Sequence, residues 1–222
     1  MEIPVHDKDT RSAEDVWAVQ PGEITRIRPI HLGITLLLIV VGILAGAFGS
    51  INFPLGFGVN FFWTGIAVQQ VGAVWFGAWG VLAGTIFPIF SNVLSGLPLG
   101  SSTAAAATPM YVSLAYIPAN FIQAFLPAWA FRRYRADPRL RSGRDFLVLL
   151  AAMLVSSAFG ALWSPLVVLR GFGMLETESL PMFVWGWFGG NMVAGLVYNF
   201  VLLKALSPMV IRSKAFVKKW FA

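Results

Sequence analysis

The chain has 222 residues, of which 57% are hydrophobic and only 12% are charged, and its mean hydropathy is +0.73. This composition excludes an ordinary water-soluble globular domain, and the lack of cysteine excludes disulfides and thiolate metal sites. In a soluble protein the net charge of +6 would suggest a nucleic-acid partner, but here we attribute it to loops that face an anionic lipid bilayer.

Residues 1–30 form a charged segment that contains Pro4 and Pro21. The segment lacks the apolar core and the small-residue cleavage site of a signal peptide, so we expect a cytoplasmic tail. Val16 and Trp17 stand among its charges. This pattern fits either a short surface helix or a disordered segment.

Residues 32–131 contain no Asp, Glu, Lys or Arg. A helix that spans a bilayer needs roughly twenty apolar residues, so this run is long enough for four helices. The second and third of them must meet in a corner that no charged residue marks. The four are expected at residues 32–50, from residue 59 to a corner between residues 71 and 80, from that corner to residue 94, and at residues 109–131.

The remainder of the chain alternates between charged loops and apolar runs. A dense cluster of arginines at residues 132–145 indicates a solvated loop. Two further apolar runs predict helices at residues 146–169 and 182–203, and a basic tail follows at residues 205–222.

The distribution of basic residues predicts the orientation in the membrane. Six helices with both termini in the cytoplasm place every Lys and Arg on the cytoplasmic side except Arg170. Five or seven helices would instead send the arginine cluster or the lysine-rich tail across the membrane. Long apolar runs without alternation exclude a barrel. We therefore predict an all-α, six-helix, multi-pass protein of the cytoplasmic membrane, with tails at residues 1–30 and 205–222 and a transmembrane domain at residues 31–204.

Catalytic and metal-binding groups are missing from the predicted helices. No ionisable side chain lies at membrane depth, which argues against proton relays and intramembrane catalysis. His6 belongs to the tail, and His31 lies at the inner end of the first helix. Because no metal-ligand spacing and no phosphate-binding glycine loop occur either, we expect no enzyme activity, no cofactor and no metal.

Amide side chains occur mainly in the outer half of the predicted helices. An unpaired amide in hydrocarbon costs several kcal/mol, so each amide should face the interior of the bundle. There the amides either form interhelical hydrogen bonds that hold the bundle together or line a binding cavity. The outer amides are Asn60, Asn92, Asn120 and Asn191, whereas Gln69, Gln70 and Asn199 lie nearer the inner face.

Aromatic residues near the outer helix ends interleave with these amides, as in Tyr116 and Asn120 or Trp187 and Asn191. An interfacial aromatic belt explains each ring by itself, but rings with a few placed polar groups also suit a small-molecule pocket. We predict a pocket for a neutral or largely apolar ligand, with Arg170 as a possible anion partner at its mouth. Its predicted lining is Asn60, Trp63, Asn92, Tyr116, Asn120, Trp163, Trp187 and Asn191.

Small residues recur at helical spacing in the first predicted helix. Gly42 and Gly46 share one face, and Ala45 and Gly49 share the next. Such spacing lets two helix backbones approach closely. The face either packs within this chain or docks on another membrane subunit.

These features together resemble the substrate-binding components of energy-coupling-factor transporters over residues 32–203. The resemblance rests on six helices with termini inside, the small-residue face of the first helix, a Pro/Gly-rich outer loop at residues 54–58, and glycines at 72, 77, 80 and 84. It implies a ligand held between the helices near the outer face. It also implies that Gly42, Ala45, Gly46 and Gly49 dock on a membrane coupling subunit that works with ATPases.

Residues 62–67, 117–133 and 144–147 are also similar to the integral-membrane sensor domain found ahead of histidine kinases and diguanylate cyclases. That resemblance implies signalling through a separate partner. A third interpretation is a non-catalytic accessory subunit that scaffolds a larger membrane complex, in which the amides pair with one another.

Overall fold

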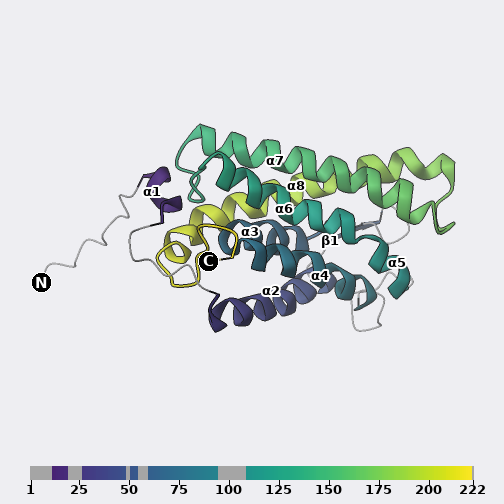
Figure 1. Cartoon of the computed structure of the whole chain (residues 1–222). Coiled ribbons are helices and arrows are strands. Elements are labelled where there is room, and N and C mark those ends of the chain that lie inside the picture. Colours follow the sequence, from purple (N-terminus) through teal and green to yellow (C-terminus); the bar gives the residue numbers. More distant parts are fainter. Residues whose placement is uncertain (1–11, 20–26, 49–50, 55–59, 95–108, 222) are drawn as a thin grey trace, which may run out of the picture.

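The computed structural model describes residues 12–19, 27–48, 51–54, 60–94 and 109–221 (Figure 1). Nearly all secondary structure in this part of the chain is helical, which confirms the predicted all-α class apart from one short hairpin. The α-helices are α1 (Ala13–Trp17), α2 (Pro29–Phe48), α3 (Gly65–Phe76), α4 (Ala78–Leu94), α5 (Met110–Ala115), α6 (Ile117–Arg133), α7 (Gly143–Leu162) and α8 (Leu180–Val210). A π-helix, η1 (Trp163–Leu169), continues α7, a 3-10 turn, η2 (Thr177–Ser179), precedes α8, and β1 (Ile51–Pro54) pairs antiparallel with β2 (Asn60–Phe62).

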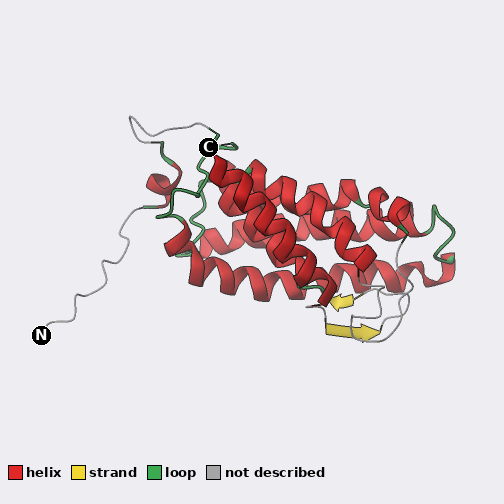
Figure 2. Cartoon of the chain, turned by 90° about the horizontal axis from the view of Figure 1, so that it is seen from below, coloured by secondary structure: helices red, strands yellow, loops and turns green. Residues whose placement is uncertain are grey.

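The long helices run side by side in an elongated bundle (Figures 1 and 2). At one end lie α1 and residues 211–221, and we call this the terminal end. At the opposite end lie α5 and the β1–β2 pair, and we call this the hairpin end. Helix α3 occupies the middle of the bundle, and almost all of its residues are buried.

Four helical segments in the described part of the chain are long and apolar enough to cross a membrane, which indicates a membrane protein. They are Pro29–Phe48, Met110–Arg133, Gly143–Leu169 and Thr177–Val210. The other two predicted spans are the shorter helices α3, with 12 residues, and α4, with 17. At a rise of about 1.5 Å per residue, α3 covers only about 18 Å of a hydrocarbon core of about 30 Å. Four of the six predicted spans therefore have full length, and the other two, α3 and α4, are shorter.

The turn between the second and third predicted helices, expected between residues 71 and 80, lies at Gly77. This residue adopts a left-handed conformation with φ of 57°, which favours glycine, and its N–H donates to the carbonyl oxygen of Ala73. Three residues later, a Cβ at Gly80 would overlap the carbonyl oxygen of Gly72. Helices α3 and α4 therefore touch backbone to backbone next to their turn.

Apolar side chains also cover the outside of the bundle, as expected where lipid is the solvent. Helix α2 is the clearest case because its buried residues are mostly small or polar, and its large apolar side chains point outward. The exposed residues of this α2 face are Leu32, Leu36, Leu37, Val40, Val41, Leu44 and Phe48.

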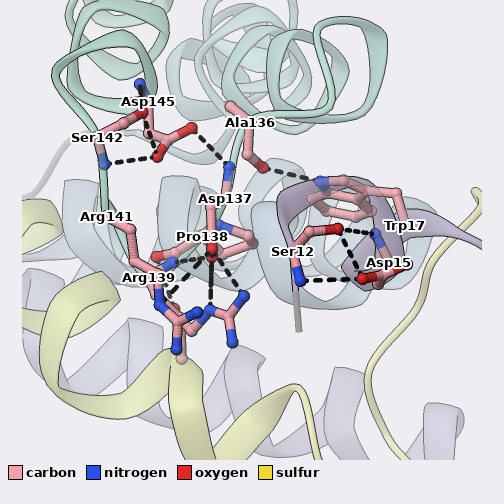
Figure 3. A network of polar contacts seen from close by, with 11 residues as sticks. Ser12, Asp15, Trp17, Ala136, Asp137, Pro138, Arg139, Arg141, Ser142 and Asp145 are labelled. Carbon is pink, nitrogen blue, oxygen red and sulfur yellow. Dashed lines mark hydrogen bonds and ion pairs between the residues drawn. The ribbon is translucent and has the colours of Figure 1, made fainter. Parts of the chain in front are cut away.

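The described parts of both tails fold onto the terminal end of the bundle. Val16 and Trp17 belong to the short helix α1 and are buried, so the helical alternative holds for this part of the N-terminal segment. Trp17 Nε1 donates to the carbonyl oxygen of Ala136 at 2.8 Å (Figure 3). In the C-terminal segment, the N–H of Val217 donates to the carbonyl oxygen of Trp75, the residue before the last of α3, at 3.0 Å.

The loop between α6 and α7 is ordered by ionic contacts (Figure 3). Asp137 and Arg139 form a buried ion pair at 2.7 Å. Asp145 accepts from the N–H of Asp137 and caps the start of α7 together with Ser142. This capping box explains why α7 begins at Gly143, a few residues before the start expected from hydropathy alone.

Candidate ligand-binding site

Aromatic side chains predicted to line a pocket meet at the hairpin end. The rings of Tyr116 and Trp187 stack with centroids 5.8 Å apart, joining the start of α6 to α8. Trp163, the first residue of η1, donates through Nε1 to the carbonyl oxygen of Ala115 at 2.9 Å. These three rings, from the junction of α5 with α6, from η1 and from α8, form what we call the aromatic cluster.

Apolar side chains surround the aromatic cluster and bury Tyr116. They come from α5, η1, the following loop and α8, and the buried ones are Val112, Val168, Leu169, Leu175 and Phe183. The cluster therefore closes the space between α6, η1 and α8 at the hairpin end with apolar surface.

Polar side chains follow directly inside the aromatic cluster, where α6 packs against α7. Asn120 and Gln123 lie one turn apart on the buried side of α6, with 7% and 3% of their surfaces exposed. Ser157 on α7 and Ser164 on η1 are 0% and 1% exposed. These four residues, which we call the α6–α7 seam, each carry a buried polar atom without a hydrogen-bond partner: Asn120 Nδ2, Gln123 Nε2, Ser157 Oγ and Ser164 Oγ.

Gly160 on α7 allows α6 and α7 to approach closely at the seam. It lies between Ser157 and Ser164 along the chain, and a Cβ at this position would lie 2.5 Å from Gln123 Nε2. The amide of Gln123 therefore rests against the backbone of α7, where only a glycine leaves room for it.

The central helix α3 adds two adjacent glutamines next to the seam. Gln69 Nε2 donates to the carbonyl oxygens of Gly84 at 2.9 Å and Asn120 at 3.0 Å, which leaves Gln69 Oε1 without a partner. Gln70 turns the other way and accepts from Asn199 Nδ2 at 2.5 Å. The two glutamines thus connect α3 to α4 and α6 on one side and to α8 on the other.

The π-helix η1 carries both Trp163 of the aromatic cluster and Ser164 of the seam. Pro165 has no N–H to donate, and the wider π turn spans residues Trp163–Leu169. π turns inserted into α-helices are frequent at functional sites because they shift side chains out of the regular helical register.

Five of the predicted lining residues lie on α6, η1 and α8 or, for Tyr116, at the cap directly before α6: Tyr116, Asn120, Trp163, Trp187 and Asn191. Asn191 is buried one turn from Trp187 on α8.

Trp63 and Asn92 of the predicted lining, and Arg170 at the predicted mouth, lie on other elements. Trp63 stacks on Phe87 of α4 at 5.9 Å, beside α2. Asn92 lies near the end of α4, and Arg170 is exposed after η1. Asn60 lies in β2, and its side chain is outside the described part of the structure.

Sequence reasoning missed Gln123, Ser157 and Ser164 and placed Gln69 and Gln70 outside the pocket. Gln123 follows Asn120 by three residues and therefore shares its helix face, which is a signal that the sequence does contain. The serines carry no such signal, because Ser is common in membrane helices wherever they pack closely.

The predicted docking face of α2 is used for packing within the chain. A Cβ at Gly42 would lie 2.5 Å from the ring of Phe87, and one at Gly46 would lie 2.7 Å from Ser91 Oγ, both on α4. Ala45 is half-buried, and Gly49 lies outside the described residues. In this structure Gly42 and Gly46 therefore pack against α4, which is the alternative of packing within the chain, and docking on another subunit stays a prediction.

Charged side chains are absent from the stretches of α6, α7, η1 and α8 that carry the seam and the aromatic cluster, whereas Arg170 and Glu176 lie exposed next to Leu169 and Leu175. Residues 60–94, 109–131, 146–169 and 180–203 contain no Asp, Glu, Lys or Arg. Within the described part of the chain, no three His, Asp or Glu residues lie close enough to hold a metal ion together. The candidate site therefore offers neutral hydrogen-bonding groups and aromatic surface.

Comparison with known proteins gives no relatives: no protein-family model, no curated protein and no solved structure matches the chain.

Proposed function

We propose that this protein binds a small neutral molecule inside its helix bundle, between the α6–α7 seam and the aromatic cluster. The observation that carries the proposal is the set of unpartnered polar atoms in the seam. A buried polar atom left without a partner costs about 1–3 kcal/mol, so the four seam atoms together cost roughly 4–12 kcal/mol. That sum is comparable to the entire stability of a typical domain, about 5–15 kcal/mol. A molecule that pairs with these atoms would remove much of this cost.

The proposed topology is six crossings with both termini in the cytoplasm. The arginine-rich loop and the basic C-terminal segment both lie at the terminal end, and basic residues favour the cytoplasmic side. The hairpin end, with the aromatic cluster, then faces outward. The short helix α3 crosses in the middle of the bundle, and α4 crosses beside it with Leu82 and Phe90 exposed toward the lipid.

Ligand uptake is the proposed purpose of binding, by analogy with the substrate-binding components of energy-coupling-factor transporters. A chain without a nucleotide motif or membrane acids needs an external energy source, namely a coupling subunit with ATPases. With Gly42 and Gly46 covered by α4, the remaining contact surface of α2 for such a subunit is its exposed apolar face.

Signalling is the second candidate, and the docked tails favour it. The central helix α3 carries Gln69 and Gln70 beside the site, and its far end accepts a hydrogen bond from Val217 of the C-terminal segment. The N–H of Ala78, just past the α3–α4 turn, also donates to the carbonyl oxygen of Trp220 at 2.7 Å. A ligand that moves α3 would therefore move the C-terminal segment, which a separate partner could detect.

Ligand retention tests the proposed function. The full-length protein, purified in mild detergent, should carry a small molecule visible by native mass spectrometry. Trp187→Ala should lose it, because Trp187 stacks on Tyr116 in the aromatic cluster. Trp185→Ala is the matched control, since Trp185 lies on the same helix but is 71% exposed. Equal retention by both variants, or no bound molecule in any preparation, would refute the proposed site.

The copurifying proteins separate the two candidate functions. An ATPase together with a membrane coupling protein supports uptake. A histidine kinase or a diguanylate cyclase supports signalling. Retention of a large membrane complex with no small molecule supports the accessory-subunit interpretation instead.

A further inference from the structure

The unpartnered atoms of the α6–α7 seam define what kind of group a ligand must present. The nitrogen of a primary amide only donates hydrogen bonds, so Asn120 Nδ2 and Gln123 Nε2 both require acceptors. Ser157 Oγ and Ser164 Oγ can donate or accept, because a hydroxyl does both. The seam therefore offers two fixed donors and two adaptable groups to whatever lies beside it.

The acceptor on the ligand must be uncharged. A carboxylate or a phosphate buried beside the seam would need a cation, and residues 109–131 and 146–169, which form both sides of the seam, contain no Lys or Arg. The exposed Arg170 lies beyond η1, six residues after Ser164 along the chain. Carbonyl oxygens are the neutral groups that accept from amide nitrogens without a counter-charge.

The body of the ligand must suit the aromatic cluster. Tyr116 lies one turn from Asn120 on α6, and Trp163 directly precedes Ser164, so the rings and the unpartnered atoms lie next to each other along both helices. Around them, Val112, Val168 and Phe183 contribute only apolar surface. Flat rings stack well on such side chains, whereas a polyhydroxylated molecule would leave its own hydroxyls unsatisfied.

We infer that the site takes a neutral ring compound whose carbonyl oxygens accept hydrogen bonds from Asn120 and Gln123 while its ring packs against Trp163 and Trp187. This inference rests on the proposed function and narrows it to a ligand class. The same chemistry occurs in lipid-soluble quinones, which would arrive through the bilayer, and in uncharged cyclic imides such as uracil, which would arrive from water.

A matched pair of probes tests the need for carbonyl oxygens. Equilibrium dialysis of the full-length protein in detergent would compare a dimethyl-naphthoquinone with the dimethyl-naphthalene of the same skeleton, each corrected for its partition into empty micelles. A quinone is a safe probe because the chain has no cysteine to react with it. We expect the protein to bind the quinone about tenfold more tightly, the effect of roughly one hydrogen bond. Uracil and a short-chain ubiquinone then distinguish a water-borne from a membrane-borne ligand.

Two variants locate the effect at the seam. Gln123→Met keeps the length of the side chain but removes its amide, and it should reduce the preference for the quinone, because only Asn120 then donates to a carbonyl oxygen. Ser156→Ala is the control, because Ser156 on α7 already has partners in Met153 and Gln70. It should keep the preference.

The outcomes separate the ligand class from the proposed function. Equal binding of the two naphthalene skeletons, or a Gln123→Met variant that keeps the full preference, overturns the carbonyl class while small-molecule binding stands. A native ligand without any carbonyl oxygen would also overturn the carbonyl class and leave small-molecule binding in place. If neither probe binds and native mass spectrometry finds no ligand, both the class and the proposed function are wrong.

Discussion

The guanidinium of Arg132 holds the C-terminal segment to the bundle, and its removal should release that segment. Arg132 Nη2 donates to the carbonyl oxygen of Val217 at 2.7 Å, and Nε donates to that of Lys219 at 2.8 Å. The same guanidinium lies over the rings of Trp17 at 5.0 Å and Trp220 at 5.3 Å. One side chain at the end of α6 therefore contacts both tails.

The magnitude of the effect follows from these contacts. Hydrogen bonds from a charged donor contribute about 1.5–3 kcal/mol each, and partly exposed cation–π contacts contribute about 0.5–1 kcal/mol each. The lower limits sum to about 4 kcal/mol for two bonds and two ring contacts. Because Arg132 is partly exposed to solvent, we take about half of that, roughly 2 kcal/mol. This energy corresponds to an increase of about thirtyfold in the opening equilibrium of the segment.

Hydrogen exchange measures the opening directly. The amide of Val217 is the reporter, because it is bonded to the carbonyl oxygen of Trp75 only while the segment is docked. In Arg132→Met this amide should exchange about thirtyfold faster than in the unaltered protein. Arg133→Met is the matched control, since Arg133 is the exposed neighbour. An unchanged Val217 amide in Arg132→Met, or the same acceleration in both variants, would contradict the assigned role of Arg132.

Two glycine substitutions test the packing of the bundle. Gly80→Ala should prevent normal folding, because a Cβ there meets the backbone of α3, which has no room to move. The variant should therefore elute as aggregates in size-exclusion chromatography. Gly33→Ala is the control, because a Cβ there meets nothing within 4 Å, and it should elute normally. Gly160→Ala should leave a folded protein with ligand binding weakened about tenfold, because the new methyl group displaces the flexible amide of Gln123 from the seam. Gly143→Ala, with open space around it, should bind as before. A monomeric Gly80→Ala protein, or a Gly160→Ala protein with unaltered affinity, would show that the corresponding contact is looser than described.

The sequence by itself determined the solvent and the approximate positions of the helices. Backbone groups in hydrocarbon must be bonded within the helix, so long uncharged runs such as residues 32–131 become helices whatever surrounds them. The α3–α4 corner was predictable within residues 71–80 for the same reason, because a charge-free run of that length has to turn. Tyr116, Trp163 and Trp187 were predictable as neighbours because each lies near a helix end on the same side of the predicted topology.

Only the tertiary structure decided which faces of the helices meet. Helical spacing shows that Gly42 and Gly46 share a face, but the identity of the opposite surface, Phe87 and Ser91 of α4, depends on how α2 is rotated and placed. The meeting of Gln123 with Gly160 depends in the same way on how α6 packs against α7.

The docking of the two tails on Arg132 joins segments that lie at opposite ends of the chain, and no local pattern encodes such a contact. Local periodicity reports the direction of a side chain relative to its own helix. The partner of that side chain is set by long-range packing, which is why the helices were foreseeable and the unpartnered atoms of the seam were not.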